Sequence, residues 1–287
     1  MSLQRGVDAR MFAVQRPAQS ATRFALRIIE SPSLSIKLEP PTEELELDDT
    51  AAPAPAWPAR SAGLEIVSAR QAAVPKIRGW PELTLRRRLL HALANHELQA
   101  VELYARALVQ FSDSAAAFRR DLLRIILEEQ HHARMYMTQL EKIGGRFGDQ
   151  PVSGYFWRKT ALLDTPLRFV CAMSLTFENA NLDHTLESRQ VALQAGDQES
   201  AELFATVHRD EIEHVRFGWR WLARLKPVEQ STWDTFTGSL LAPLHPGRAS
   251  GREFHAGPRR AAGLDDDFIE RLREAWSKRT SGAPRGT

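Results

Sequence analysis

The sequence of 287 residues predicts an all-α protein built around a bundle of four long helices. Between about residues 85 and 225, apolar residues recur with the period of an α-helix, and short polar or glycine-containing breaks interrupt the pattern. Two of the four segments also carry a glutamate followed three positions later by a histidine. Because 43% of the residues are hydrophobic, the chain can bury a substantial core.

Residues 1–84 are expected to form an N-terminal arm that packs on this bundle. One short helix is predicted at residues 21–30, where the apolar residues again follow the helical period. The stretch 40–58 is rich in proline and acidic residues, so it cannot build a core of its own. It forms either a flexible arm or a strap that lies on the bundle, and we favour the strap.

Residues 85–226 are expected to form the bundle itself. Gly144-Gly145 ends the second helix, Thr165-Pro166 supplies an N-cap and a first helical residue for the third, and Gly196-Asp197 separates the third from the fourth. The long connection between the second and third helices is expected to cross from one helix pair to the other. The helices are placed near residues 85–111, 115–143, 166–194 and 198–225.

Residues 227–287 are expected to form a C-terminal extension with one short helix, at Asp265–Lys278. Acidic residues offset most of its arginines, which is typical of a solvated surface rather than of a site for a polyanion.

The composition excludes several classes of protein. The formal net charge is only +2, and no basic stripe interleaved with aromatic residues indicates a nucleic-acid surface. The single cysteine, Cys171, rules out an internal disulfide framework. No long uncharged apolar run predicts a membrane span. Residues 1–30 are rich in arginine but have no apolar signal core, so we expect a mature cytoplasmic protein.

The second helix places one glutamate and one histidine on its apolar face. Residues three and four positions apart share a helix face, and Glu129 and His132 share theirs with apolar residues such as Leu122. Both are therefore expected to point into the core. Glu128 and His131 have the same spacing, but their face is polar and is assigned to water.

The other helices add the remaining candidates by the same test. Glu211 and His214 lie on the apolar face of the fourth helix, whereas Glu213 lies on its polar face. In the first helix Glu97 is apolar-facing and Glu102 is not. The third helix offers Glu178 on a narrow, partly polar face, with Asp183 as the alternative. The six predicted metal ligands are Glu97, Glu129, His132, Glu178, Glu211 and His214.

Four carboxylates that face one dry interior predict a bound metal. Each would cost several kcal/mol if it were left unpaired, and two divalent cations would cancel their four negative charges. Both histidines can then remain neutral nitrogen ligands. Mixed oxygen and imidazole ligation favours two iron ions, with a manganese–iron pair or manganese alone as alternatives, over structural zinc.

Four short segments carry a resemblance to a known family. They are Asn95–Ala100, Glu128–His132, Tyr155–Trp157 and Arg209–Val215. The chain resembles an uncharacterised bacterial family of ferritin-like proteins, a domain of unknown function whose relatives include the tRNA isopentenyl-adenosine hydroxylases. The resemblance runs from about Arg23 to Gly263. It implies a ferritin-like four-helix bundle with a non-haem di-iron centre, and it implies no substrate.

The resemblance also implies a role for each ligand. The glutamates of the two Glu-x-x-His pairs would bridge the ions, the other two glutamates would be terminal ligands, and each histidine would bind one ion. Asp210, next to Glu211, is a candidate to hold an imidazole through its other nitrogen, with a solvated helix residue as the alternative.

For several residues near the predicted ligands, the sequence leaves two structural roles open. Tyr104, Tyr136 and Cys171 continue the same faces and either line a substrate pocket or pack in the core. Gly218 either leaves room for a substrate or permits a close helix approach. His96 is expected to be an ordinary core histidine.

These patterns predict an oxidoreductase that uses dioxygen and an electron donor to hydroxylate or oxidise an organic substrate, a small molecule or a nucleoside. A tRNA substrate follows from the resemblance alone and is not favoured. Iron handling by a ferritin-like protein and a metal-stabilised interaction protein are the alternatives. The oligomeric state is left open, with a homodimer as one alternative. Glu129→Ala is expected to abolish bound metal and Glu128→Ala to leave it in place.

Overall fold

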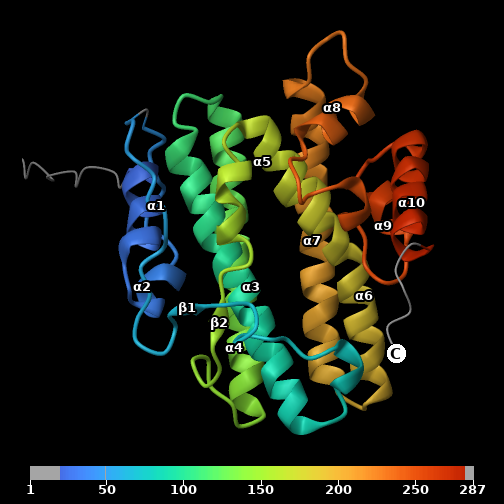
Figure 1. Cartoon of the computed structure of the whole chain (residues 1–287). Coiled ribbons are helices and arrows are strands. Elements are labelled where there is room, and N and C mark those ends of the chain that lie inside the picture. Colours follow the sequence, from blue (N-terminus) through green and yellow to red (C-terminus); the bar gives the residue numbers. More distant parts are fainter. Residues whose placement is uncertain (1–19, 49, 282–287) are drawn as a thin grey trace, which may run out of the picture.

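The computed structural model describes residues 20–48 and 50–281, which are mostly helical (Figure 1). The prediction of an all-α protein is confirmed. Residues 1–19, which belong to the predicted N-terminal arm, lie outside the described residues, as do residues 49 and 282–287. In the part of the chain that is described, no helix is long and apolar enough to cross a membrane.

The long helices begin and end close to their predicted bounds. α3 packs along α4, α6 packs along α7, and α4 contacts α7, so that two helix pairs face each other. The residue ranges are α3 Leu83–Gln110, α4 Ala116–Lys142, α5 Pro166–Ala172, α6 Asn179–Gln194 and α7 Gln198–Leu225.

Local sequence features start and stop these helices. The Thr165 hydroxyl accepts a hydrogen bond from the first turn of α5, where Pro166 occupies the first position, and Asp197 caps α7 in the same way. Gly144 and Gly196 follow α4 and α6 with φ of 75° and 72°, a left-handed conformation that side-chain-bearing residues rarely adopt.

The third predicted helix is interrupted by a π-helical turn at Met173–Glu178, between α5 and α6. The Thr176 hydroxyl donates to the carbonyl of Cys171, five residues earlier, at 2.8 Å. π-helical turns inside α-helices occur often at functional sites, and this one ends at a predicted ligand. Helical periodicity alone could not reveal it, because the extra residue changes the spacing only locally.

Gly218 of α7 lies directly against this π-helical turn. A β-carbon at residue 218 would lie 2.4 Å from the β-carbon of Ser174 and 3.1 Å from Leu175. No side chain larger than that of glycine fits without a shift of the backbone. Of the two roles considered for Gly218, close helix approach is the one that the packing requires.

The N-terminal segment packs along one side of the long helices (Figure 1). α1, Ala21–Glu30, coincides with the predicted short helix and packs on α3, and α2, Leu34–Leu38, packs on α4. Further along, β1, Ile66–Val67, pairs in parallel with β2, Val152–Ser153. Short 3₁₀ turns occur at Ile77–Gly79 and Trp157–Leu162.

Glu102 is buried, although its neighbours in sequence placed it on a polar helix face. Its carboxylate lies 2.9 Å from Lys37 Nζ and 2.6 Å from Arg60 Nη2, and it accepts a hydrogen bond from the Trp157 indole. Two cations of the N-terminal segment therefore neutralise Glu102. Its assignment as a non-ligand agrees with these contacts.

The C-terminal extension contains more helix than the sequence predicted. The single predicted helix corresponds to α10, Asp266–Ser281, but α8, Thr232–Ser239, and α9, Ala256–Ala261, are also present, with a 3₁₀ turn at Pro246–Arg248. The prediction of one helix was wrong because α8 and α9 are too short to be stable alone and depend on tertiary packing. α8 packs on α5 and α7, and α9 on α6 and α7.

Candidate metal centre

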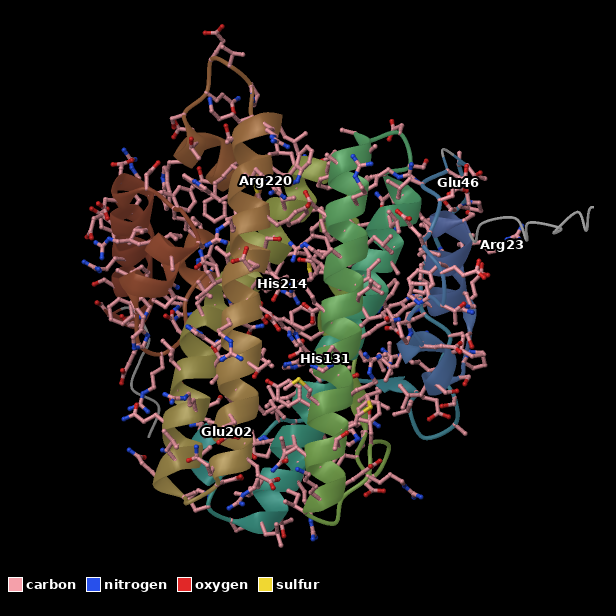
Figure 2. The ribbon with its side chains drawn as sticks, turned by 180° about the vertical axis from the view of Figure 1, so that it is seen from behind. Arg23, Glu46, His131, Glu202, His214 and Arg220 are labelled. Atoms are coloured by element: carbon pink, nitrogen blue, oxygen red, sulfur yellow. The ribbon has the colours of Figure 1, made fainter. Side chains whose placement is uncertain are left out.

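The structure brings all six predicted ligands together in the interior between the long helices. None of the six is more than 5% exposed. Figure 2 labels His214 about midway along α7, with Glu202 and Arg220 toward the two ends of that helix. Among the described residues, the ligands form two groups that share Glu129, with their ligand atoms within 4.8 Å of one another in each group. The groups are Glu129, Glu178, Glu211, His214 and Glu97, Glu129, His132.

Several ligand atoms of these groups are buried without a hydrogen-bond partner in the described protein. They are both carboxylate oxygens of Glu129, Oε2 of Glu211, and Nδ1 of His132 and of His214. His214 Nδ1 lies 3.2 Å from Glu129 Oε1 and 3.4 Å from Glu211 Oε2. His132 Nδ1 lies 3.5 Å from Glu129 Oε2. Buried polar atoms are rarely left unpaired, so oxygen and nitrogen donors that meet in this way fit divalent cations.

The Nε2 atom of each histidine lies within hydrogen-bond distance of an acidic side chain on the other helix. His132 Nε2 of α4 lies 2.9 Å from Asp210 Oδ2 of α7, and His214 Nε2 of α7 lies 3.0 Å from Glu128 Oε2 of α4. Each acid immediately precedes the ligand glutamate of its own helix. Such contacts fix the ring and leave Nδ1 to face the ligand groups. Asp210 therefore has the orienting position, rather than that of a solvated residue.

The assignment of Glu128 to water was wrong. Its side chain is 30% exposed, and it binds both Arg124 of its own helix and His214 of α7. The periodicity of one helix describes only that helix, whereas a glutamate at the edge of a face is long enough to reach a neighbouring helix. Glu128→Ala is therefore no longer expected to leave metal binding unchanged, because it removes the contact with His214.

Loss of either orienting acid should weaken metal binding. We expect Asp210→Asn and Glu128→Gln each to lower metal affinity by about 10- to 100-fold, the usual effect of removing a partner of a metal-binding histidine. Competition titrations with a chromogenic chelator measure the affinity. Glu213→Gln is the matched control, since among the described residues Glu213 pairs with the exposed Arg216 and lies outside both ligand groups. Equal affinities in all three variants would show that the two acids do not support the ligands.

Shifted pKa values favour the protonated forms of three candidate ligands. Burial and the nearby Glu129 carboxylate raise the pKa of Glu97 well above its usual range, and burial with Glu211 does the same for the pKa of Glu178. Burial disfavours a charged His132, but the hydrogen bond to Asp210 raises its pKa to about 9. Metal ions must displace these protons, so metal binding is expected to weaken as the pH falls.

Asn181 is a residue of the site that the sequence analysis did not single out. Its side-chain amide donates to Glu211 Oε1 at 3.0 Å and to Glu178 Oε2 at 3.3 Å. It therefore positions one ligand from each of two helices. Its spacing of one turn from Glu178 on a partly polar face was the available indication.

Asp183, the alternative ligand of the third helix, instead contacts residues of the C-terminal extension. Arg259 of α9 binds both of its carboxylate oxygens at 2.9 Å, and the backbone amides of Gly251 and His255 donate to it at 2.9 and 3.0 Å. Asp183 therefore attaches the C-terminal extension to α6, and Glu178 is the residue that reaches the ligand groups.

Tyr104 and Cys171 pack in the core beside the site. The Tyr104 hydroxyl is buried and lies 3.3 Å from the hydroxyl of Ser174. Cys171 is fully buried, and burial raises the pKa of its thiol to about 12. A thiol with such a pKa is not a reactive nucleophile at neutral pH.

A cavity of about 430 Å³ borders the ligand groups. Glu97 and Glu178 line it, and so does Tyr136, which places this tyrosine at a pocket as well as in the core. His96 also lines it, half-buried and edge-on to Phe156 with ring centroids 5.5 Å apart. It is therefore a residue of the cavity wall as well as a packed histidine, and it belongs to neither ligand group. The volume is in the range of sites for small organic molecules.

Comparison with known proteins gives a family. Residues 15–270 match the family described as "Protein of unknown function (DUF455)". The chain is also similar to an "Uncharacterized protein" of Haemophilus influenzae, with 27% identity over 140 residues, which is 46% of this chain and 49% of that relative. The chain thus matches about half the length of this curated relative. No solved structure matches it. Because the family match extends over most of the sequence, the chain belongs to the DUF455 family.

Proposed function

We propose that this protein is a ferritin-like di-iron oxidoreductase that uses dioxygen to hydroxylate or oxidise an organic substrate. The observation that carries the proposal is the meeting of buried, unpartnered carboxylate and imidazole atoms from separate helices beside a cavity. A purely structural role for these groups leaves buried oxygen and nitrogen atoms without a hydrogen-bond partner among the described residues.

The source of each ligand supports a ferritin-like arrangement. α4 and α7 each contribute a Glu-x-x-His pair, while α3 and the π-helical turn each contribute a single glutamate. This division of ligands over four helical segments is the one expected of di-iron and di-manganese carboxylate bundles. Oxygen-rich ligation with one imidazole for each ion favours iron, and a manganese–iron pair or manganese alone is the alternative.

Bound ferrous iron would supply the electrons that reduce dioxygen, and an external electron donor would restore it. The remaining roles belong to the protein. Asp210 and Glu128 hold the imidazoles, and Asn181 holds the carboxylates of Glu178 and Glu211. The substrate would approach through the cavity, since Glu97 and Glu178 line it. A small organic molecule fits this volume, whereas a folded tRNA would have to insert a single base.

Oxygen chemistry can be tested directly. Metal-free protein is loaded anaerobically with ferrous iron and then mixed rapidly with oxygenated buffer, while visible absorption and dioxygen consumption are followed. We expect a transient absorption band and rapid oxygen uptake in proportion to the bound iron, and the Glu213→Gln control should behave like the unmodified protein.

Other outcomes would favour other functions. Tightly bound iron that consumes no dioxygen would reject the proposal in favour of a structural metal. Accumulation of many ferric ions for each chain would indicate iron storage instead.

A further inference from the structure

The C-terminal extension contributes residues to the wall of the cavity that borders the ligand groups. Arg248, in the 3₁₀ turn Pro246–Arg248, and Arg279, in α10, both line it, together with Ser250. This 3₁₀ turn packs against α10 and also contacts the π-helical turn. One cavity therefore extends from two predicted ligands, Glu97 and Glu178, to two guanidinium groups.

Arg248 and Arg279 form no ion pair within the described residues, and Arg248 is exposed to solvent. Within residues 20–48 and 50–281, the side chain of Arg248 has no hydrogen bond or ion pair. Arg279 donates to the carbonyl of Gly251 at 2.6 Å, and it has no carboxylate partner in the same part of the chain. Burial and, secondarily, repulsion by Arg248 lower the pKa of Arg279, whereas the negative charge of Asp183 acts in the opposite direction. A bound anion would relieve this repulsion.

Ser250 is the second, independent indication of a ligand. Its side chain is 2% exposed, it lines the cavity, and its hydroxyl oxygen has no hydrogen-bond partner among the described residues. A buried hydroxyl without a partner is unfavourable and uncommon. An oxygen atom of a ligand placed between the arginines would provide that partner.

Aromatic side chains form part of the cavity wall and can pack against an apolar portion of a ligand. Tyr155, Phe156 and Phe177 line it and pack edge to face, with centroids 5.1 Å apart for Tyr155–Phe156 and 4.9 Å apart for Phe156–Phe177. Because Glu97 and Glu178 are acidic and Arg248 and Arg279 are basic, an anionic molecule in the cavity would turn its charge toward the arginines and away from the carboxylates.

We propose that this cavity binds an organic anion, with an aromatic or other apolar body between the rings and a carboxylate, sulfonate or phosphate group held by Arg248, Arg279 and Ser250. The inference rests on the proposed function only in naming this molecule as the substrate, since the anion contacts come from protein residues alone. Two arginines that the sequence analysis assigned to a solvated surface thereby become determinants of specificity.

The test compares two fluorescent probes of similar shape on the full chain. 8-Anilinonaphthalene-1-sulfonate carries a sulfonate, and N-phenyl-1-naphthylamine is its uncharged counterpart. We expect the Arg248→Gln/Arg279→Gln variant to bind the sulfonate at least about tenfold more weakly, because two charge-assisted contacts are lost. Its affinity for the uncharged probe should change by less than about twofold, since the apolar contacts remain.

A matched control removes two positive charges elsewhere in the extension. Arg252 and Arg271 are exposed and do not line the cavity, so Arg252→Gln/Arg271→Gln should bind both probes as the unmodified protein does. Ala180→Phe, which narrows the cavity, should weaken both probes. An unchanged sulfonate affinity in Arg248→Gln/Arg279→Gln, or an equal loss in the control pair, would overturn the proposal.

The same titrations separate this inference from the proposed function. Metal-free protein should still bind the sulfonate, because no metal contributes to the anion contacts. If oxygen uptake is observed but selective sulfonate binding is not, the substrate class is wrong and the oxidoreductase stands. If selective sulfonate binding is observed without oxygen uptake, the cavity is an anion site, and its occupant is a ligand rather than the substrate of an oxidation.

Discussion

Replacing Glu129 with glutamine should leave the protein almost free of bound metal. Glu129 is the residue shared by both groups of ligands, with one oxygen 3.2 Å from His214 Nδ1 and the other 3.5 Å from His132 Nδ1. Both oxygens are buried without a hydrogen-bond partner. An amide keeps the shape but substitutes N–H donors for one of the two ligand oxygens and removes the charge. Elemental analysis of the purified variant measures the remaining metal.

The loss of bound metal should also change the free energy of unfolding. A metal that binds only the folded protein adds about 4 kcal/mol to the free energy of unfolding when its free concentration is about 1,000 times its dissociation constant. We expect this gain for the unmodified protein and for Glu213→Gln, and no gain for Glu129→Gln. A Glu129→Gln variant that retains a full complement of metal would contradict the shared position of this residue.

The second large effect is expected at the junction between α6 and the C-terminal extension. Arg259 is completely buried, binds both oxygens of Asp183 at 2.9 Å, and donates to the carbonyls of Asn179, Ala249 and His255. Arg259→Gln leaves the Asp183 carboxylate buried without its cation. Breaking a buried ion pair in this way typically costs about 3–5 kcal/mol, so the free energy of unfolding should fall by that amount.

Denaturant unfolding of neighbouring variants checks this assignment. Arg260→Gln is the control, because Arg260 is exposed and its pair with Asp266 is expected to contribute at most about 1 kcal/mol. In the double variant Asp183→Asn/Arg259→Gln, part of the loss should be recovered, since the uncompensated charge is removed. Similar stabilities for Arg259→Gln and Arg260→Gln would show that the buried pair does not anchor the extension.

Helical periodicity was sufficient to select the candidate ligands that the structure brings together, because they share helix faces with the core. Glu129 was separated from Glu128 by one residue of register and Glu211 from Glu213 by two, and the structure places Glu129 and Glu211 in the interior. The same reasoning failed for Glu128, which leaves its own face to reach His214 of α7. It preferred Glu178 but left Asp183 as an alternative, because the contact of Asp183 with Arg259, distant in sequence, leaves no trace in the periodicity.

The amino-acid sequence by itself determined the all-α class, the extent of the long helices and the candidate ligands, because these depend on the spacing of residues within one helix. Only the tertiary structure decided the crossed contacts of Asp210 and Glu128, the need for glycine at residue 218, the short helices α8 and α9, and the presence of Arg248 and Arg279 in the cavity wall. Each of these depends on contacts between segments that are far apart in the chain, and such contacts leave no periodic pattern in either segment alone.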